Sequence, residues 1–222
     1  MGGASLIETL HQADMDATLW LNSLSTPFTE QMWQLFSNKG FWIPMYAILL
    51  YLLFDRLGWK RALVVLASVA LAFGLCDQCS NLVKYSVARL RPSYNSDMLQ
   101  AGLNVLEGRG GFYGFFSAHA ANAFAVATCL NIGFRADKTH TYNALYKVTL
   151  LWATLVSVSR IFVGKHFLGD VLAGILIGSV IGYFVAMLAR HIIRKHIEKV
   201  KPEGLTFHFD LKPSGGNPTV SE

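Results

Sequence analysis

The chain carries little charge for its length. Lys, Arg, Asp and Glu make up 15% of its 222 residues, whereas 53% belong to the hydrophobic class; a typical soluble domain has about 25% charged residues. An ordinary soluble enzyme is therefore disfavoured, because a globule of this size needs a charged coat. Disorder is excluded, since it requires low hydrophobicity and high net charge. Three cysteines are too few for a disulfide-rich secreted module, which leaves an integral membrane protein of one domain.

Long stretches without charge separate the few charged residues. Five windows hold at most one Lys, Arg, Asp or Glu each: residues 40–54, 62–83, 110–134, 148–164 and 171–189. A transmembrane helix needs about 20 mostly apolar residues, so the second, third and fifth windows fit well. The fourth fits only with Arg160 at its polar end, and the first is short and borrows residues upstream. The sequence predicts an all-α, polytopic membrane helix bundle of five transmembrane helices, or six if another span lies near the N-terminus.

Residues 1–39 differ from the rest because acidic side chains outnumber basic ones there. Apolar residues recur at loosely helical spacing from Leu6 to Trp20, which predicts that this N-terminal segment forms an amphipathic helix on a membrane face. The alternative is a poorly ordered terminus. We expect no signal peptide, because a basic start and an unbroken apolar run are missing. The transmembrane domain is then expected over residues 40–195, followed by a polar tail over residues 196–222.

The basic residues predict the orientation of the bundle. Twelve of the 19 fall in three groups that share one side of a five-span topology, within residues 56–61, 135–147 and 190–212. An excess of Lys and Arg marks the cytoplasmic side. Six others fall on the opposite, outer side: Lys84, Arg89, Arg91, Arg109, Arg160 and Lys165. Charged side chains at a membrane boundary usually have a functional role. The alternative role for these six is to anchor the protein to lipid headgroups.

Three clusters of polar residues fall at the outer ends of predicted spans. The first is Lys84 followed by six residues and then Arg91-Pro92, and the second is Ser117-Ala118-His119. The third is Ser159-Arg160, then His166 after five residues, then Asp170 after three more. Together they bring two His, one Asp, two Arg, one Lys and two Ser to one membrane face.

This set of side chains suits phosphoryl chemistry. Lys84, Arg91 and Arg160 supply fixed positive charge, and guanidinium groups match phosphate oxygens in pairs. The Ser117 hydroxyl and backbone N–H groups at the start of the third span add donors. A phosphoryl group that spreads its charge over its equatorial oxygens is stabilised by such donors.

The histidines supply the reacting groups. His166 and Asp170 stand four residues apart and share a helix face. A carboxylate on one ring nitrogen fixes the tautomer and leaves the other nitrogen free to attack. His119 is then the second proton-transfer group, which protonates the leaving oxygen and later deprotonates a water.

These motifs resemble those of the type 2 phosphatidic-acid phosphatase superfamily, which also includes bacterial acid phosphatases and vanadium haloperoxidases. The family pattern is K-x6-R-P, then P-S-G-H, then S-R-x5-H-x3-D, and this chain matches it over residues 84–170. The resemblance implies that His166 forms a phosphohistidine, that His119 is the general acid and that Asp170 orients His166. It further implies that Lys84, Arg91, Ser117 and Arg160 hold the phosphoryl oxygens, and that neither a metal nor another cofactor is needed.

The second motif departs from the family pattern. Phe116 replaces the usual Pro, and Ala118 replaces Gly. The backbone N–H of Ala118 survives, so we still expect it to contact a phosphoryl oxygen. The methyl group of Ala118 is expected to narrow the phosphate pocket. The two replacements therefore affect the geometry of the turn and the fit of the substrate more than catalysis.

Several further residues are candidates for supporting roles. Asp77 shares a helical stripe with Lys84, where it either supports Lys84 or contacts a neighbouring helix. Arg109 either binds substrate or belongs only to the outer loop, and Ser159 is a supporting candidate through its place in the motif. Arg89 and Lys165 lie off the pattern and are interpreted as headgroup or surface contacts. The Gly-rich loop over residues 93–115 is expected to cover a headgroup pocket.

The sequence therefore predicts a membrane lipid phosphatase that hydrolyses a lipid phosphate monoester or diphosphate. Lipid A and undecaprenyl diphosphate are the favoured substrates, and phosphatidylglycerol phosphate and phosphatidic acid are alternatives. Other hypotheses are a lipid phosphotransferase and a non-catalytic transport or lipid-binding protein. We expect a bacterial inner membrane location with the site on the outer, periplasmic face. The expected partners are the bilayer and its lipid phosphate, without nucleic acid or an obligate protein partner.

Overall fold

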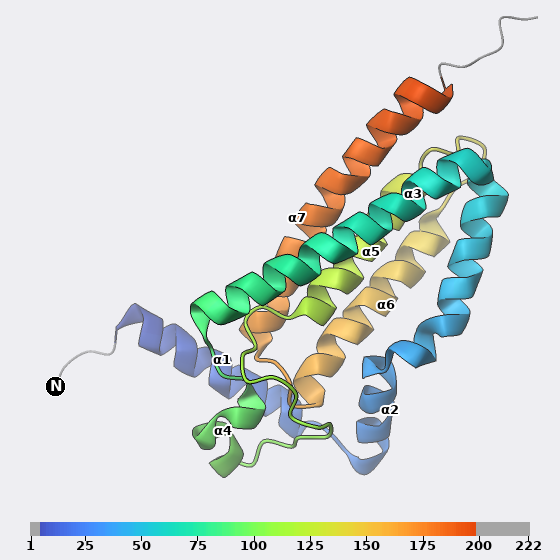
Figure 1. Cartoon of the computed structure of the whole chain (residues 1–222). Coiled ribbons are helices and arrows are strands. Elements are labelled where there is room, and N and C mark those ends of the chain that lie inside the picture. Colours follow the sequence, from blue (N-terminus) through green and yellow to red (C-terminus); the bar gives the residue numbers. More distant parts are fainter. Residues whose placement is uncertain (1–4, 199–222) are drawn as a thin grey trace, which may run out of the picture.

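The computed structural model describes residues 5–198, and every regular element in that range is helical. The long helices run beside one another as a bundle (Figure 1). The α-helices are α1 (Leu6–Ser23), α2 (Pro27–Ser37), α3 (Ile43–Val87), α4 (Ser96–Gln100), α5 (Ala118–Phe134), α6 (Asn143–Phe162) and α7 (Leu168–Ile192). Short helical turns occupy Lys39–Trp42, Pro92–Tyr94 and Ile193–Glu198. The predicted all-α fold is confirmed, and the predicted tail lies almost wholly outside the described residues.

Helix α3 contains two of the predicted spans. Its 45 residues would reach about 68 Å if straight, more than twice the hydrocarbon thickness of about 30 Å. Instead, the chain folds back at Gly58, whose φ of 69° and ψ of 162° are not helical. Residues with a Cβ atom are sterically excluded from this combination of φ and ψ, so a glycine is required at this position. The two arms of α3 form a hairpin that flanks α5 and α6 (Figure 1).

Within residues 5–198, three helical segments are long and apolar enough to cross a membrane: Lys39–Val87, Asn143–Phe162 and Leu168–Glu198. The first of these contains both arms of α3. Helix α5 is shorter, with 17 residues, and packs among α3, α6 and α7. The window predicted over residues 110–134 was too long, because residues 110–117 are a loop and α5 begins only at Ala118. The protein is an integral membrane protein.

Helices α5 and α7 meet through small residues. Gly174, Gly178 and Gly182 recur at intervals of four on α7 and lie against the backbone of α5. A methyl group added at Gly182 would lie 2.8 Å from the Ala125 carbonyl oxygen. A methyl group added at Gly178 would overlap the Ala121 carbonyl oxygen. Such residues let helix backbones approach closely. The close fit fixes α5 against α7, so that the first turns of both helices lie at the same end of the bundle.

The N-terminal segment forms two helices: α1 corresponds to the predicted amphipathic helix, and α2 follows it as a second helix. Thr26 caps α2 through its side chain, and Pro27 begins that helix, a position where its missing N–H costs nothing. Helix α1 is amphipathic as expected, but its polar stripe faces the protein, with Thr18 and Asn22 buried. Large apolar side chains of α1 are exposed instead, among them Leu6, Ile7, Leu10 and Trp20.

We predict that Gly178→Ala destabilises the protein by about 1–3 kcal/mol, the usual cost of overpacking a tight contact. Its methyl group would overlap the Ala121 carbonyl oxygen, so α7 must shift away from α5. Thermal unfolding in detergent measures the loss. The matched control is Gly74→Ala on α3, where nothing lies within 4 Å of the added methyl. Equal melting temperatures for the two variants would contradict the prediction.

Candidate active site

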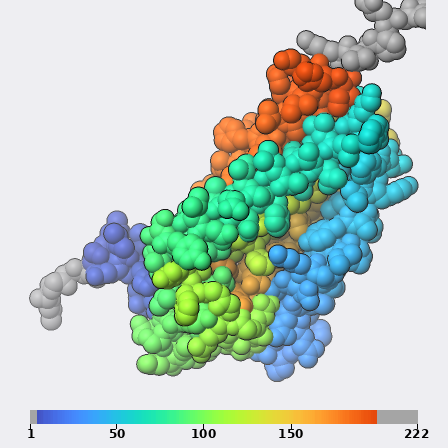
Figure 2. All heavy atoms as spheres, in the orientation of Figure 1, coloured from blue at the N-terminus to red at the C-terminus, as the bar shows by residue number. Residues whose placement is uncertain are grey.

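The three sequence motifs converge at one end of the bundle. Lys84 lies near the end of α3, Ser117 precedes α5, Arg160 lies in the last turn of α6, and His166 and Asp170 flank the start of α7. The loop between α3 and α5 covers this end, as the green and yellow-green atoms in Figure 2 show. Residues from four separate helices or their ends therefore form a single site.

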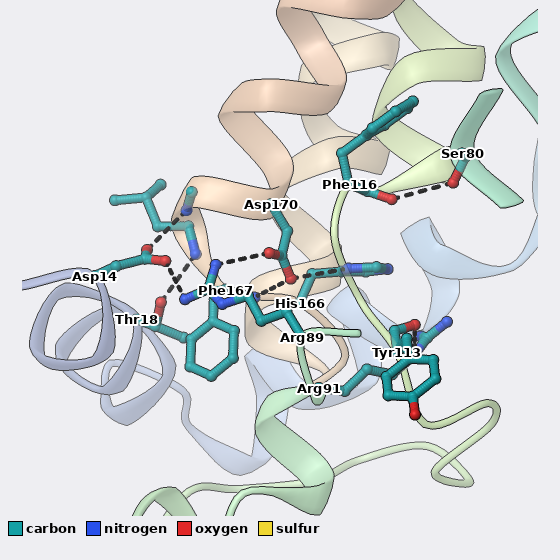
Figure 3. A network of polar contacts seen from close by, with 12 residues as sticks. Asp14, Thr18, Ser80, Arg89, Arg91, Tyr113, Phe116, His166, Phe167 and Asp170 are labelled. Carbon is teal, nitrogen blue, oxygen red and sulfur yellow. Dashed lines mark hydrogen bonds and ion pairs between the residues drawn. The ribbon is translucent and has the colours of Figure 1, made fainter. Parts of the chain in front are cut away.

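His166 and Asp170 form a buried pair. The His166 Nδ1 atom lies 3.4 Å from Asp170 Oδ2, and the side chains are 2% and 0% exposed. The Phe167 N–H also donates to Asp170 Oδ2, at 3.1 Å, as Figure 3 shows. Burial lowers the pKa of His166 to about 4, although Asp170 opposes the shift. The imidazole is therefore neutral near pH 7, and with Nδ1 turned to Asp170 its Nε2 lone pair can attack an electrophile.

Arg160 and Ser117 each present a buried donor without a partner among residues 5–198. Arg160 is 4% exposed; its Nη1 contacts Ser37 Oγ and lies 3.6 Å from the Glu107 carboxylate. Within the described residues, neither the Arg160 Nε nor the Ser117 hydroxyl has a hydrogen-bond partner. Leaving a buried donor unpaired costs about 1–3 kcal/mol. Two such donors in the matched motifs mark a place where an oxygen-rich ligand would restore the lost hydrogen bonds.

Backbone hydrogen bonds hold the motifs together. The Arg91 N–H donates to Phe112 O and the Gly114 N–H to Arg89 O, both at 2.9 Å. The segment after α3 thus pairs with the segment before α5, and Arg91 Nε also donates to Tyr113 O at 3.2 Å. The Ser117 N–H donates to the Asp170 carbonyl at 2.9 Å, which links the second motif to the third.

His119 lies in the first turn of α5 on the wall of a cavity of about 340 Å³. Most of the lining is apolar, with Phe73, Val126 and Trp152 among its members, and Asp77 and Lys39 are its charged members. The cavity extends from His119 between α3, α5 and α6. Half-buried His119 can therefore exchange protons beside an apolar space.

The supporting candidates occupy different places. Asp77 forms no ion pair with Lys84 within the described residues and instead lines the His119 cavity. The Ser159 hydroxyl donates to Val156 O inside α6. Arg109 lies on the exposed loop, 5.6 Å from the centre of the Tyr94 ring. Ala118 begins α5 directly after Ser117.

Two expectations about surface contacts were wrong. Arg89 is only 19% exposed and donates to the Asp170 carboxylate at 2.8 Å. Lys165 is 6% exposed, and its ammonium group donates to the Gly108 carbonyl. Both side chains point into the protein because hydrogen-bond acceptors from distant parts of the chain, Asp170 and Gly108, lie there. Charge pattern alone could not reveal this.

The structure also brings in residues that no motif singled out. Glu107 and Ser37 contact Arg160, and Asp14 binds Arg89 at 2.6 Å. Gly114 lies so close to the pair that a methyl group there would be 2.9 Å from Asp170 Oδ2. Of these residues, only Gly114 carried a sequence signal, as a glycine in the loop expected to cover the site.

The chain is similar to a protein family and to curated relatives. A family model described as the PAP2 superfamily matches residues 61–194. The chain is 36% identical over 186 residues to a lipid A 4'-phosphatase of Bacteroides thetaiotaomicron, over 82% of this chain and 80% of the relative. It is 34% identical over 182 residues to a lipid A 4'-phosphatase of Porphyromonas gingivalis, over 81% of this chain and 74% of the relative.

A solved structure has a similar fold. The transmembrane PAP2-type phosphatidylglycerolphosphate phosphatase of Bacillus subtilis matches with a TM-score of 0.66 and 21% identity. The match covers 84% of this chain and 89% of that one. At this identity the similarity concerns the arrangement of the helices.

We predict that Gly114→Ala lowers kcat/KM about 100-fold, the scale expected when reacting groups are displaced by about 1 Å. The added methyl group would meet Asp170 Oδ2 at 2.9 Å and Arg91 Cγ at 3.2 Å. Gly111→Ala is the matched control in the same loop, because nothing lies within 4 Å of its methyl group. Phosphate release from a lipid phosphate by both variants, at equal folded concentration, is the measurement. Similar rates would show that the loop tolerates a side chain beside Asp170.

Proposed function

The chain belongs to the PAP2 superfamily, and from this premise we propose that it removes phosphate from lipid A through a phosphohistidine intermediate. The comparisons confirm the predicted class, a membrane lipid phosphatase. Lipid A is the favoured substrate because relatives named lipid A 4'-phosphatase match most of the chain at 36% and 34% identity. Undecaprenyl diphosphate is the alternative substrate, since an archaeal relative of 28% identity carries that activity in its name.

One observation carries the mechanism: two buried donors that have no partner within the described part of the chain lie in the motifs that frame a neutral, buried histidine. Ser117 Oγ and Arg160 Nε are the donors, and the low pKa of His166, about 4, leaves its ring uncharged. Phosphoryl oxygens would accept from both donors, and Lys84 and Arg91 would add positive charge. Such fixed donors stabilise the charge that develops in phosphoryl transfer.

The proposed reaction has two steps. His166 Nε2 attacks phosphorus, the bond between phosphorus and the lipid oxygen breaks, and His119 gives its proton to that oxygen. The phosphoryl group is then bonded to His166. His119 next takes a proton from water, the resulting hydroxide attacks phosphorus, and the bond to His166 breaks to release inorganic phosphate. Asp170 holds the His166 ring throughout.

The chemistry is tested by phosphate release from detergent-solubilised protein in the presence of EDTA. The panel contains lipid A, undecaprenyl diphosphate, phosphatidylglycerol phosphate and phosphatidic acid. We expect lipid A to be hydrolysed fastest, EDTA to leave the rate unchanged, and His166→Ala to lower it by at least about 1,000-fold, because the nucleophile is lost.

The alternatives give different results. Activity lost in EDTA and restored by a divalent cation would contradict metal independence. Labelled phosphate recovered on a second lipid instead of in water would indicate a phosphotransferase. No turnover of any lipid by folded protein would favour a non-catalytic role.

We also propose that the site faces outward from a bacterial inner membrane. Basic residues gather at the end of the bundle away from the site, around the Gly58 hairpin, the connection between α5 and α6, and the end of α7 (Figure 1). This end fits the cytoplasmic side, where Lys and Arg are enriched.

The orientation predicts where single cysteines react. Ser96 and Lys138 are exposed residues at opposite ends of the bundle. In spheroplasts, Ser96→Cys should react with a membrane-impermeant maleimide, whereas Lys138→Cys should react only after lysis. The native chain is the control for its own three cysteines. The reverse pattern would place the site in the cytoplasm.

A further inference from the structure

Helix α1 presents a line of polar side chains to the catalytic end of the bundle. Asp14, Thr18 and Asn22 are spaced by four residues and therefore share one face. Thr18 and Asn22 are buried, and the Asp14 side chain is 16% exposed. Asn22 donates to the carbonyls of Ile161 and Phe162, at the end of α6. The stripe therefore fixes α1 to the connection that carries His166.

The same stripe caps α7. The first N–H groups of a helix have no partner within it, and Phe167, which precedes α7, has no polar side chain to supply one. The Leu168 N–H instead donates to Thr18 Oγ1 at 2.9 Å, and the Gly169 N–H donates to Asp14 Oδ1 at 2.7 Å. A carboxylate is favoured at this end of a helix. Helix α1 thus supplies, from a distant part of the chain, the acceptors that the catalytic helix lacks.

Arg89 joins Asp14 to Asp170. Its Nη2 donates to Asp14 Oδ2 at 2.6 Å, and its Nη1 donates to Asp170 Oδ1 at 2.8 Å, as Figure 3 shows. The guanidinium carbon lies 4.0 Å from the centre of the Phe167 ring. The planar guanidinium holds its donors in a fixed fork, so the two carboxylates and the ring determine its position.

We propose that Asp14 and Arg89 are positioning residues that orient Asp170 for the reaction. The inference rests on the proposed function of His166 as nucleophile. The terminal torsion of an Asp side chain is broad, so a carboxylate held through one oxygen alone can swing. Arg89 holds Oδ1, which keeps Oδ2 on His166 Nδ1 and the Phe167 N–H. Asp14 in turn holds Arg89 and the first turn of α7.

The test compares Asp14→Asn, Arg89→Gln and Arg89→Lys with Asp16→Asn, the matched control. Asp16 is exposed on the same helix, and among the described residues its carboxylate accepts a side-chain hydrogen bond from Gln12 alone. We expect Asp14→Asn and Arg89→Gln to lower kcat about 10- to 100-fold, with KM within about twofold of the native value. Arg89→Lys should recover part of kcat, because it keeps the charge but loses the fork. The fold decrease in kcat of the double variant Asp14→Asn/Arg89→Gln should be smaller than the product of the two single-variant decreases.

Opposite results overturn the inference. An unchanged kcat in Asp14→Asn and Arg89→Gln would show that Asp170 needs neither residue. A raised KM with native kcat in Arg89→Gln would indicate that Arg89 contacts the lipid headgroup instead. An equal loss of kcat in Asp16→Asn would show that the effect comes from general disturbance of helix α1.

Hydrogen exchange separates this inference from the proposed function. If the native protein releases no phosphate from any lipid, the proposed function fails, but the positioning contacts can still be examined. Amides of residues 163–172 should exchange faster in Asp14→Asn and Arg89→Gln than in Asp16→Asn, because the cap on α7 is weakened. Equal exchange in all three variants would overturn the inference without reference to activity.

Discussion

The Asp170 carboxylate is fully buried, and a buried charge is stable only when it is paired and hydrogen-bonded. Arg89, the Phe167 N–H and His166 meet this requirement through the two carboxylate oxygens. These partners come from the segment after α3 and from the turn before α7. Satisfying one carboxylate therefore fixes the relative positions of the first and third motifs. The Ser117 N–H, on the Asp170 carbonyl, adds the second motif.

The membrane restricts where helices and irregular segments of this protein can lie. Helices satisfy their backbone groups internally and can cross a bilayer, whereas irregular backbone must lie at the ends or inside the protein. The glycine contacts between α5 and α7 lie in the bundle, and the irregular segments that carry Arg91 and His166 lie at its end. In the proposed function, this arrangement lets the cationic and titratable groups meet a lipid phosphate at the level of the headgroups. The cavity beside His119 extends between the helices.

Much of the fold and the site could be predicted from the sequence. Windows with at most one charge indicated helices α3, α6 and α7, because a bilayer selects long apolar runs. The motif spacings singled out His119, His166, Asp170 and Arg160, which the structure places at one end of the bundle. The errors have physical causes. The start of α5 was placed too early because loop residues 110–117 carry no formal charge either, and the inward turn of Arg89 was missed because its partners lie 75 and 81 residues away.

The sequence by itself determined that this protein is a membrane helix bundle with the residues for phosphoryl transfer, since apolar length and the order of chemical groups are local properties of a chain. Only the tertiary structure decided that α1 caps α7, that Glu107 and Ser37 meet Arg160, and that Gly114 lies against Asp170. Those contacts join residues remote in sequence. They exist because buried donors and acceptors must find partners in space, and no local pattern specifies which partners these are.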